Sequence, residues 1–130
     1  MKLFYACILT LVSMTSYAQE WVPLSQSGDI SYEILAGSIR VIKAEKDSVV
    51  VGTGRVVTLT DNTITAELWA VPIAHCRVKR GVLVVLDVLG EVKSRHSFVY
   101  GLGTVAADVA EIMCRVALDA QTSKPPKVNV

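Results

Sequence analysis

Apolar and polar positions alternate along most of the chain, and this alternation predicts strands. A period of two is typical of a strand with one face buried and the other open to water. Turn signals rich in Gly, Asp and Asn separate the alternating segments. The expected strands cover residues 21–27, 30–35, 38–45, 48–60, 63–79, 82–88 and 92–99.

Three of these segments carry a local signal of their own. Residues 48–60 are β-branched almost throughout, and Gly52 and Gly54 interrupt them, which favours a bulge or a sharp bend. Pro72 marks an edge, a bulge or a break within the long strand 63–79. Residues 82–88 are apolar except for Asp87, as in a central strand. We expect the Asp87 side chain to accept hydrogen bonds from the following turn, and a buried acid with a raised pKa is the alternative.

Helical periodicity appears only after these segments. Between Thr104 and Ser123 the chain has no Gly or Pro, and Thr104 is placed to cap the helix N-terminus. Apolar residues at helical spacing predict the buried face, and a charged stripe lies opposite. The expected buried face consists of Val105, Val109, Ile112, Met113 and Val116.

Many strands followed by one helix predict an α+β domain, in which the helix lies across one face of an antiparallel sheet. The expected domain covers residues 19–121. Residues 122–130 contain two prolines and little to bury, so we expect a flexible tail.

The first residues have the pattern of a secretory signal peptide. Lys2 precedes an apolar run over residues 3–14, and small side chains at Ser16 and Ala18 predict cleavage after Ala18. The run is shorter than the ~20 residues of a transmembrane helix, and a retained N-terminal anchor is the alternative. Cys7 lies too close to the start to follow a lipoprotein signal, so it belongs to the apolar run. No other segment is long and apolar enough to span a membrane.

Cleavage would leave two cysteines, Cys76 and Cys114. An even pair in an exported chain indicates a disulfide, because the periplasm and the cell exterior are oxidising. We expect it to join the far end of strand 63–79 to the terminal helix. The alternatives are two free thiols or half of a zinc site, for which only His75 and His96 could add ligands.

Composition and motifs argue against catalysis and against several classes of partner. Without Lys2 the chain has as many basic as acidic side chains, which gives no electrostatic footprint for nucleic acid. His75 and His96 lack a nucleophile motif, and Gly101 and Gly103 lack the lysine of a phosphate loop. We therefore expect a protein that is not an enzyme and holds no metal or cofactor.

Aromatic side chains are the candidates for a ligand face, with packing in the core as the alternative. The four candidates are Trp21, Tyr32, Trp69 and Tyr100.

The order of these features resembles the surface-adhesin protein E family of Gram-negative bacteria, over about residues 21–119. The residues that carry the resemblance are Trp21, Tyr32, Ser38 with Ile39, Cys76, Asp87 with Gly90, Ser94 and Cys114. It implies a sheet of about six strands, a C-terminal helix pinned by a disulfide, and adhesion with host extracellular proteins as partners.

The sequence departs from that family in having no lipobox, and it offers no basic or aromatic cluster as a contact patch. We expect an exported, non-enzymatic domain, in the periplasm or on the cell surface, that recognises a protein partner through a sheet face or edge. A periplasmic structural or accessory protein of the envelope is the alternative.

Overall fold

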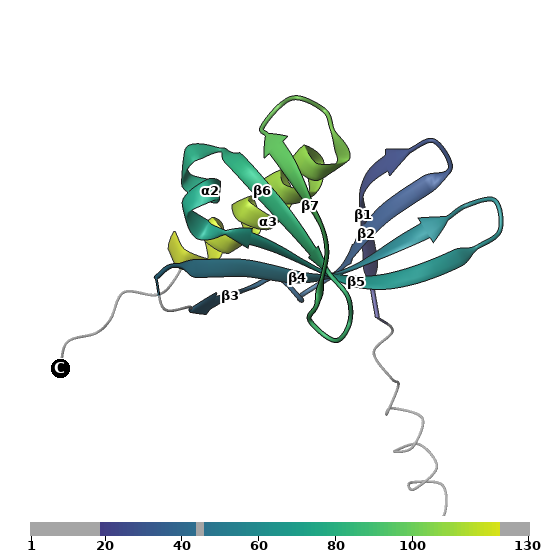
Figure 1. Cartoon of the computed structure of the whole chain (residues 1–130), viewed down its shortest axis with the longest axis horizontal. Helices are drawn as coiled ribbons and strands as arrows, with labels where there is room; N and C mark the ends of the chain where they lie inside the picture. The colour runs from purple at the N-terminus through teal and green to yellow at the C-terminus, as the bar shows by residue number, and fades with distance from the viewer. Residues whose placement is uncertain (1–18, 44–45, 123–130) are drawn as a thin grey trace, which may run out of the picture.

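The computed structural model describes residues 19–43 and 46–122, and it has the α+β architecture expected from the sequence (Figure 1). The expected signal peptide lies outside the described residues, as does the expected tail except Thr122, which ends the last helix. The elements are β1 (Trp21–Ser27), β2 (Ile30–Leu35), β3 (Arg40–Lys43), β4 (Ser48–Thr58), β5 (Thr63–Pro72), α2 (Ile73–Val78), β6 (Arg80–Leu86), β7 (Val92–Val99) and α3 (Val105–Thr122).

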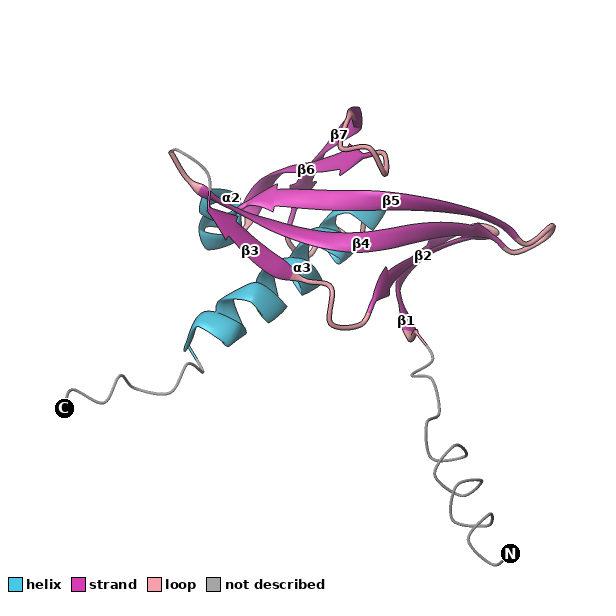
Figure 2. Ribbon diagram, turned by 90° about the horizontal axis from the view of Figure 1, so that it is seen from below, coloured by secondary structure: helices cyan, strands magenta, loops and turns pink. Residues whose placement is uncertain are grey.

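The strands form one antiparallel sheet in the order β1-β2-β4-β5-β6-β7, and β3 pairs with β4 beyond the end of β2. The sheet curls, and strands at its two ends, β1 and β7, both contact α3 (Figure 2). Strands β5 and β6 pair only over Leu68–Ala70, and Leu68 lies opposite Leu86, the last residue of β6. The first residues of β5 therefore extend past the end of β6.

The core lies between the concave face and α3. It gathers Ile34, Val50, Trp69, Val71, Leu83, Val85 and Phe98 from the strands against Ala107, Val109, Ala110, Met113, Cys114 and Ala117 of the helix. The expected buried face of the helix was only partly right, because Val116 is 44% exposed. Small side chains let a helix approach a sheet closely, so the alanine side of α3 faces the core and Val116 lies at its margin.

The expected bulge at the two strand glycines is not present. The β4–β5 register runs without a break from Val49 to Thr58. Both glycines face the core, where a Cβ atom on Gly54 would lie 2.4 Å from the Trp69 ring and one on Gly52 2.8 Å from Ile34 Cδ1. Glycine is present at these positions to make room for larger neighbours.

The expected long strand 63–79 was wrong in its second half. Strand β5 ends at Pro72, which has no N–H to continue the ladder. The helix α2 follows, and Lys79 in the left-handed conformation ends it. Cys76 therefore lies on a short helix between β5 and β6, not on a strand.

The expected disulfide is present between Cys76 and Cys114, with Cα atoms 5.3 Å apart. Both cysteines are buried. The bond joins α3 to α2, and through α2 to the two strands that flank it.

Two local expectations are confirmed. Asp87 Oδ1 accepts hydrogen bonds from the backbone N–H groups of Leu89 and Glu91, both at 2.9 Å, so Asp87 orders the β6–β7 turn. Thr104 Oγ1 accepts from the N–H of Ala107 at 3.1 Å and caps α3.

Candidate functional site

The convex face of the sheet carries an aliphatic surface that lies opposite the core. Register places Arg40, Val51, Ala70, Val84 and Arg95 in one row across β3, β4, β5, β6 and β7. Side chains directly opposite one another in neighbouring strands share a face. The row therefore has an apolar centre with an arginine at each end.

The neighbouring rows extend this centre. Leu68 pairs with Leu86 on one side, and Ile42 pairs with Val49 on the other. Figure 2 shows that α3 lies on the concave side of the sheet, so it does not cover these rows. We define the outer-face patch as Arg40, Ile42, Val49, Val51, Leu68, Ala70, Val84, Leu86 and Arg95.

The two arginines of the patch differ from a third arginine on the same face. Arg55 Nε lies 2.7 Å from Glu33 Oε1, and its guanidinium stacks 4.5 Å from the centre of the Trp21 ring. Arg40 is exposed and donates to the backbone carbonyl of Ser38, and Arg95 is exposed. The ends of the patch thus present positive charge that no carboxylate of the described residues neutralises.

The four aromatic candidates do not form one ligand face. Trp21 lies on the convex face under Arg55, while Tyr32 and Trp69 face the concave side. Tyr100 stacks on Phe98, 6.1 Å between ring centres, and lines a separate hollow of about 290 Å³ beside Cys76 and Arg115. The structure brings together only Tyr32 and Trp69.

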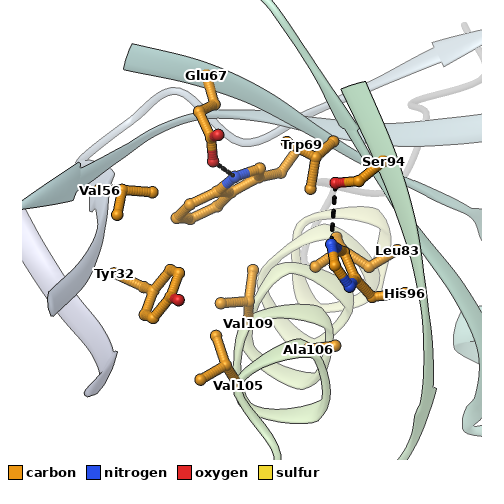
Figure 3. Close-up of a pocket in the computed structure, with 11 residues that line it drawn as sticks. Tyr32, Val56, Glu67, Trp69, Leu83, Ser94, His96, Val105, Ala106 and Val109 are labelled. Atoms are coloured by element: carbon orange, nitrogen blue, oxygen red, sulfur yellow. Dashed lines mark hydrogen bonds between the residues drawn. The ribbon is translucent and has the colours of Figure 1, made fainter. Parts of the chain in front are cut away.

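Tyr32 and Trp69 line a pocket of about 380 Å³ between the sheet and the first turns of α3 (Figure 3). Most of its wall is apolar, and the remainder is made of a few polar side chains that reach in from β5 and β7. The apolar lining is Val56, Leu83, Val85, Val105, Ala106 and Val109, and the polar lining is Glu67, Ser94 and His96. Volume and lining are those of a site for a small molecule.

The polar side of the pocket is ordered by hydrogen bonds. Glu67 accepts from Trp69 Nε1 through Oε1 at 3.0 Å and from Lys93 Nζ through Oε2 at 3.0 Å. Ser94 Oγ and His96 Nε2 are 2.9 Å apart. The ion pair also links β7 to β5 beyond the point where the β5–β6 ladder ends.

The two histidines occupy different surroundings. His75 Nδ1 accepts from the backbone N–H of Val82, and its ring packs against Gly81, so it supports the turn after α2. His96 is exposed at the rim of the pocket. Within residues 19–43 and 46–122, no group of three His, Cys, Asp or Glu side chains is placed to hold a metal ion.

Sequence reasoning missed the outer-face patch because its members come from five strands. One sequence feature did point to an open apolar face. The β-branched run in β4 and the apolar run in β6 predict strands that are apolar on both faces, which is typical of sheets covered on both sides. A single helix covers only one face, so a second apolar face had to remain open.

No helix in the described part of the chain has the length and apolar character needed to cross a membrane. Searches of protein-family models, of curated proteins and of solved structures found no match to this chain.

Proposed function

We propose that this protein is an exported, non-enzymatic binding module that recognises a protein partner through the outer-face patch. The observation that carries the proposal is an aliphatic sheet face with no helix over it. Its apolar members are half-buried, apart from the exposed Ile42 and the buried Ala70. Contiguous apolar surface left partly open on a sheet face is the usual mark of a protein–protein site. The proposal agrees with the resemblance to surface adhesins, whose partners are host extracellular proteins.

The charges of the patch indicate the kind of partner. Arg40 and Arg95 stand at opposite ends of the apolar row and carry no carboxylate partner among the described residues. A partner with an apolar centre and acidic side chains on its rim would meet both features. Complementary rim charges mainly accelerate encounter and set orientation, while the apolar centre holds the complex.

Export is supported by the disulfide. A bond between Cys76 and Cys114 persists in the periplasm and outside the cell, and it is rare in reducing compartments. The expected signal peptide over residues 1–18 is the route to those compartments.

Charge reversal tests the patch. The oxidised chain and its Arg40→Glu/Arg95→Glu variant are immobilised and exposed to host extracellular matrix proteins and to envelope proteins. Loss of a captured protein by the variant, with loss of binding as salt is raised, is the expected result. The matched control is Lys46→Glu/Arg77→Glu, which changes the net charge equally at exposed positions off the patch. Equal capture by all three chains would refute the role of the patch.

Location separates adhesion from an accessory role in the envelope. Digestion of intact cells by an added protease is expected if the module is displayed for adhesion. Release by osmotic shock without prior digestion would instead assign the patch to a periplasmic partner. Retention in the cytoplasmic fraction would contradict both roles.

A further inference from the structure

The pocket between the sheet and α3 is independent of the outer-face patch, because the two lie on opposite faces of the sheet. Its walls come from six elements, β2, β4, β5, β6, β7 and α3. Its volume of about 380 Å³ lies at the lower end of the range for small-molecule sites. The occupant is therefore a compact molecule and not a folded partner.

The open apolar lining of the pocket comes from both the sheet and the helix. Tyr32 and Val56 of the sheet and Val105 and Ala106 of α3 are half-buried, so they expose apolar surface to the pocket (Figure 3). The Trp69 indole, fixed by its hydrogen bond to Glu67, is only 2% exposed and lies almost wholly covered behind them. An apolar lining of this kind fits a ring or a short chain.

The polar groups stand along one edge of this space. Both oxygens of Glu67 already accept one hydrogen bond, and each carboxylate oxygen has a second lone pair. The Ser94 hydroxyl and the His96 ring reach into the opening from β7 (Figure 3). One hydrogen-bonding group of a ligand can thus be satisfied without a water molecule.

Charge decides which ligands are excluded. The side chain of Glu67 is 11% exposed, and Lys93 neutralises it at 3.0 Å. An ionic ligand would leave water without gaining a free counter-charge, so its desolvation would not be compensated. A neutral ligand bears no such cost.

We propose that this pocket binds a small neutral molecule made of an apolar ring or chain and one hydroxyl group. The apolar part lies against Tyr32, Val56 and Val105, and the hydroxyl donates to Glu67 or bonds to Ser94.

A matched series of probes tests the proposal by calorimetry and by backbone and indole NMR shifts of the oxidised chain. The probes are 2-naphthol, naphthalene and 2-naphthoate, which share one ring system and differ in the polar group. We expect 2-naphthol to bind and to shift the Trp69 indole N–H. Naphthalene should bind about tenfold more weakly, because it lacks one hydrogen bond, and 2-naphthoate more weakly still because of its charge.

Filling the pocket provides the second test. Ala106 lines the cavity from α3, and Ala120 is exposed near the far end of the same helix. Ala106→Leu should lower the affinity for 2-naphthol at least tenfold, and Ala120→Leu should leave it unchanged.

Three outcomes would overturn the proposal. They are the absence of 2-naphthol binding, equal or tighter binding of 2-naphthoate, and shifts confined to the outer-face patch. All three are read on the wild-type chain, so they stand even if Ala106→Leu does not fold. The outer-face charge reversal should leave 2-naphthol binding unchanged, which separates this site from the protein-binding site.

Discussion

Trp69 shows how one buried side chain dictates the identity of its neighbours. Its indole lies over Gly54 of β4, and its N–H donates to Glu67, two positions back on the same face of β5. A residue larger than glycine at position 54 would displace the ring, and loss of the carboxylate would leave its N–H unpaired. The position of the indole thus depends on Gly54, which does not line the pocket, and on Glu67, which does.

Adding one methyl group to Gly54 tests this dependence. Gly54→Ala should lower the free energy of unfolding by about 1–3 kcal/mol through overpacking, because the new Cβ meets the rigid indole. Gly52→Ala is the matched control on the same strand and face. Its Cβ would crowd Ile34 Cδ1, the far end of a flexible side chain, and would make ordinary 3.5 Å contacts with Ile39 and Met113, so the loss should be smaller. Urea unfolding measures both, and equal losses would contradict the account.

Tyr100 predicts an alkaline limit to stability. Burial, helped by the Glu111 carboxylate and opposed by Arg115, raises the pKa of Tyr100 above its ordinary value of 10.0. The folded state therefore holds this proton more tightly than the unfolded state. The resulting stability is fully present below about pH 10 and is lost as the pH rises through the raised pKa.

Tyr100→Phe isolates this contribution from other alkaline effects. Between about pH 8 and about pH 11 the wild type should lose more unfolding free energy than the variant, because only the wild type has this phenol to ionise. Urea midpoints at the two pH values measure the difference. A loss of the same size in both chains would mean that Tyr100 ionises as easily in the fold as outside it.

At the scale of elements, β6 combines two faces with different roles. Val85 is 7% exposed and packs in the core, while its neighbour Val84 points to the convex side. The strand is equally apolar on both sides, so hydrophobicity alone does not tell the two positions apart.

A pair of valine-to-threonine changes separates the roles. Threonine keeps the β-branched shape and adds a hydroxyl. Val85→Thr should cost about 1–3 kcal/mol, since its hydroxyl is buried, whereas Val84→Thr should stay within about 0.5 kcal/mol. Unfolding midpoints give both values. A large loss for Val84→Thr would show that the convex face is part of the folding core.

The elements also show how far the sequence alone could go. Alternation and turn residues located the strands well, and the fold class followed from their order. Pro72 was expected to mark an edge, a bulge or a break, but the six residues of α2 are too few for periodicity to reveal a helix. The rotation of α3 was missed because alanines count weakly in an apolar pattern, although their size decides which side approaches the sheet.

Binding sites were less predictable than elements. The outer-face patch draws residues from five strands and the pocket from five strands and α3, and only tertiary structure brings them together. Among the aromatic candidates, alternation places Tyr32 and Trp69 within their own strands but does not relate one strand to another. The bulge at Leu24 in β1 adds a register shift that no local pattern indicates.

For the whole molecule, the disulfide fixes the one helix that closes the core. Its cysteines are 38 residues apart in sequence. Closing a loop of this length stabilises a chain by about 4 kcal/mol on chain-entropy grounds. For a domain of this size that is a large share of the ~5–15 kcal/mol of net stability.

Removing either sulfur should therefore weaken the fold. Cys114→Ala or Cys76→Ala should each lower the free energy of unfolding by ~2–5 kcal/mol. The double variant should lose little more than either single variant, because the bond is already absent. Denaturant unfolding of the three variants and of the reduced wild type measures this. An unchanged midpoint in any of the four samples would contradict the structural role of the bond.

The position of α3 at the end of the domain has a consequence for biogenesis. The strands emerge from the ribosome or the translocon before residues 105–117, which supply the helical half of the core. Until then Ile34, Trp69 and Leu83 lack the helical residues that cover them, and both faces of the nascent sheet expose apolar side chains. Such a chain is prone to aggregate. The native state of this domain is thus reached only after α3 has been delivered, and a chaperone that shields the nascent sheet would raise its yield.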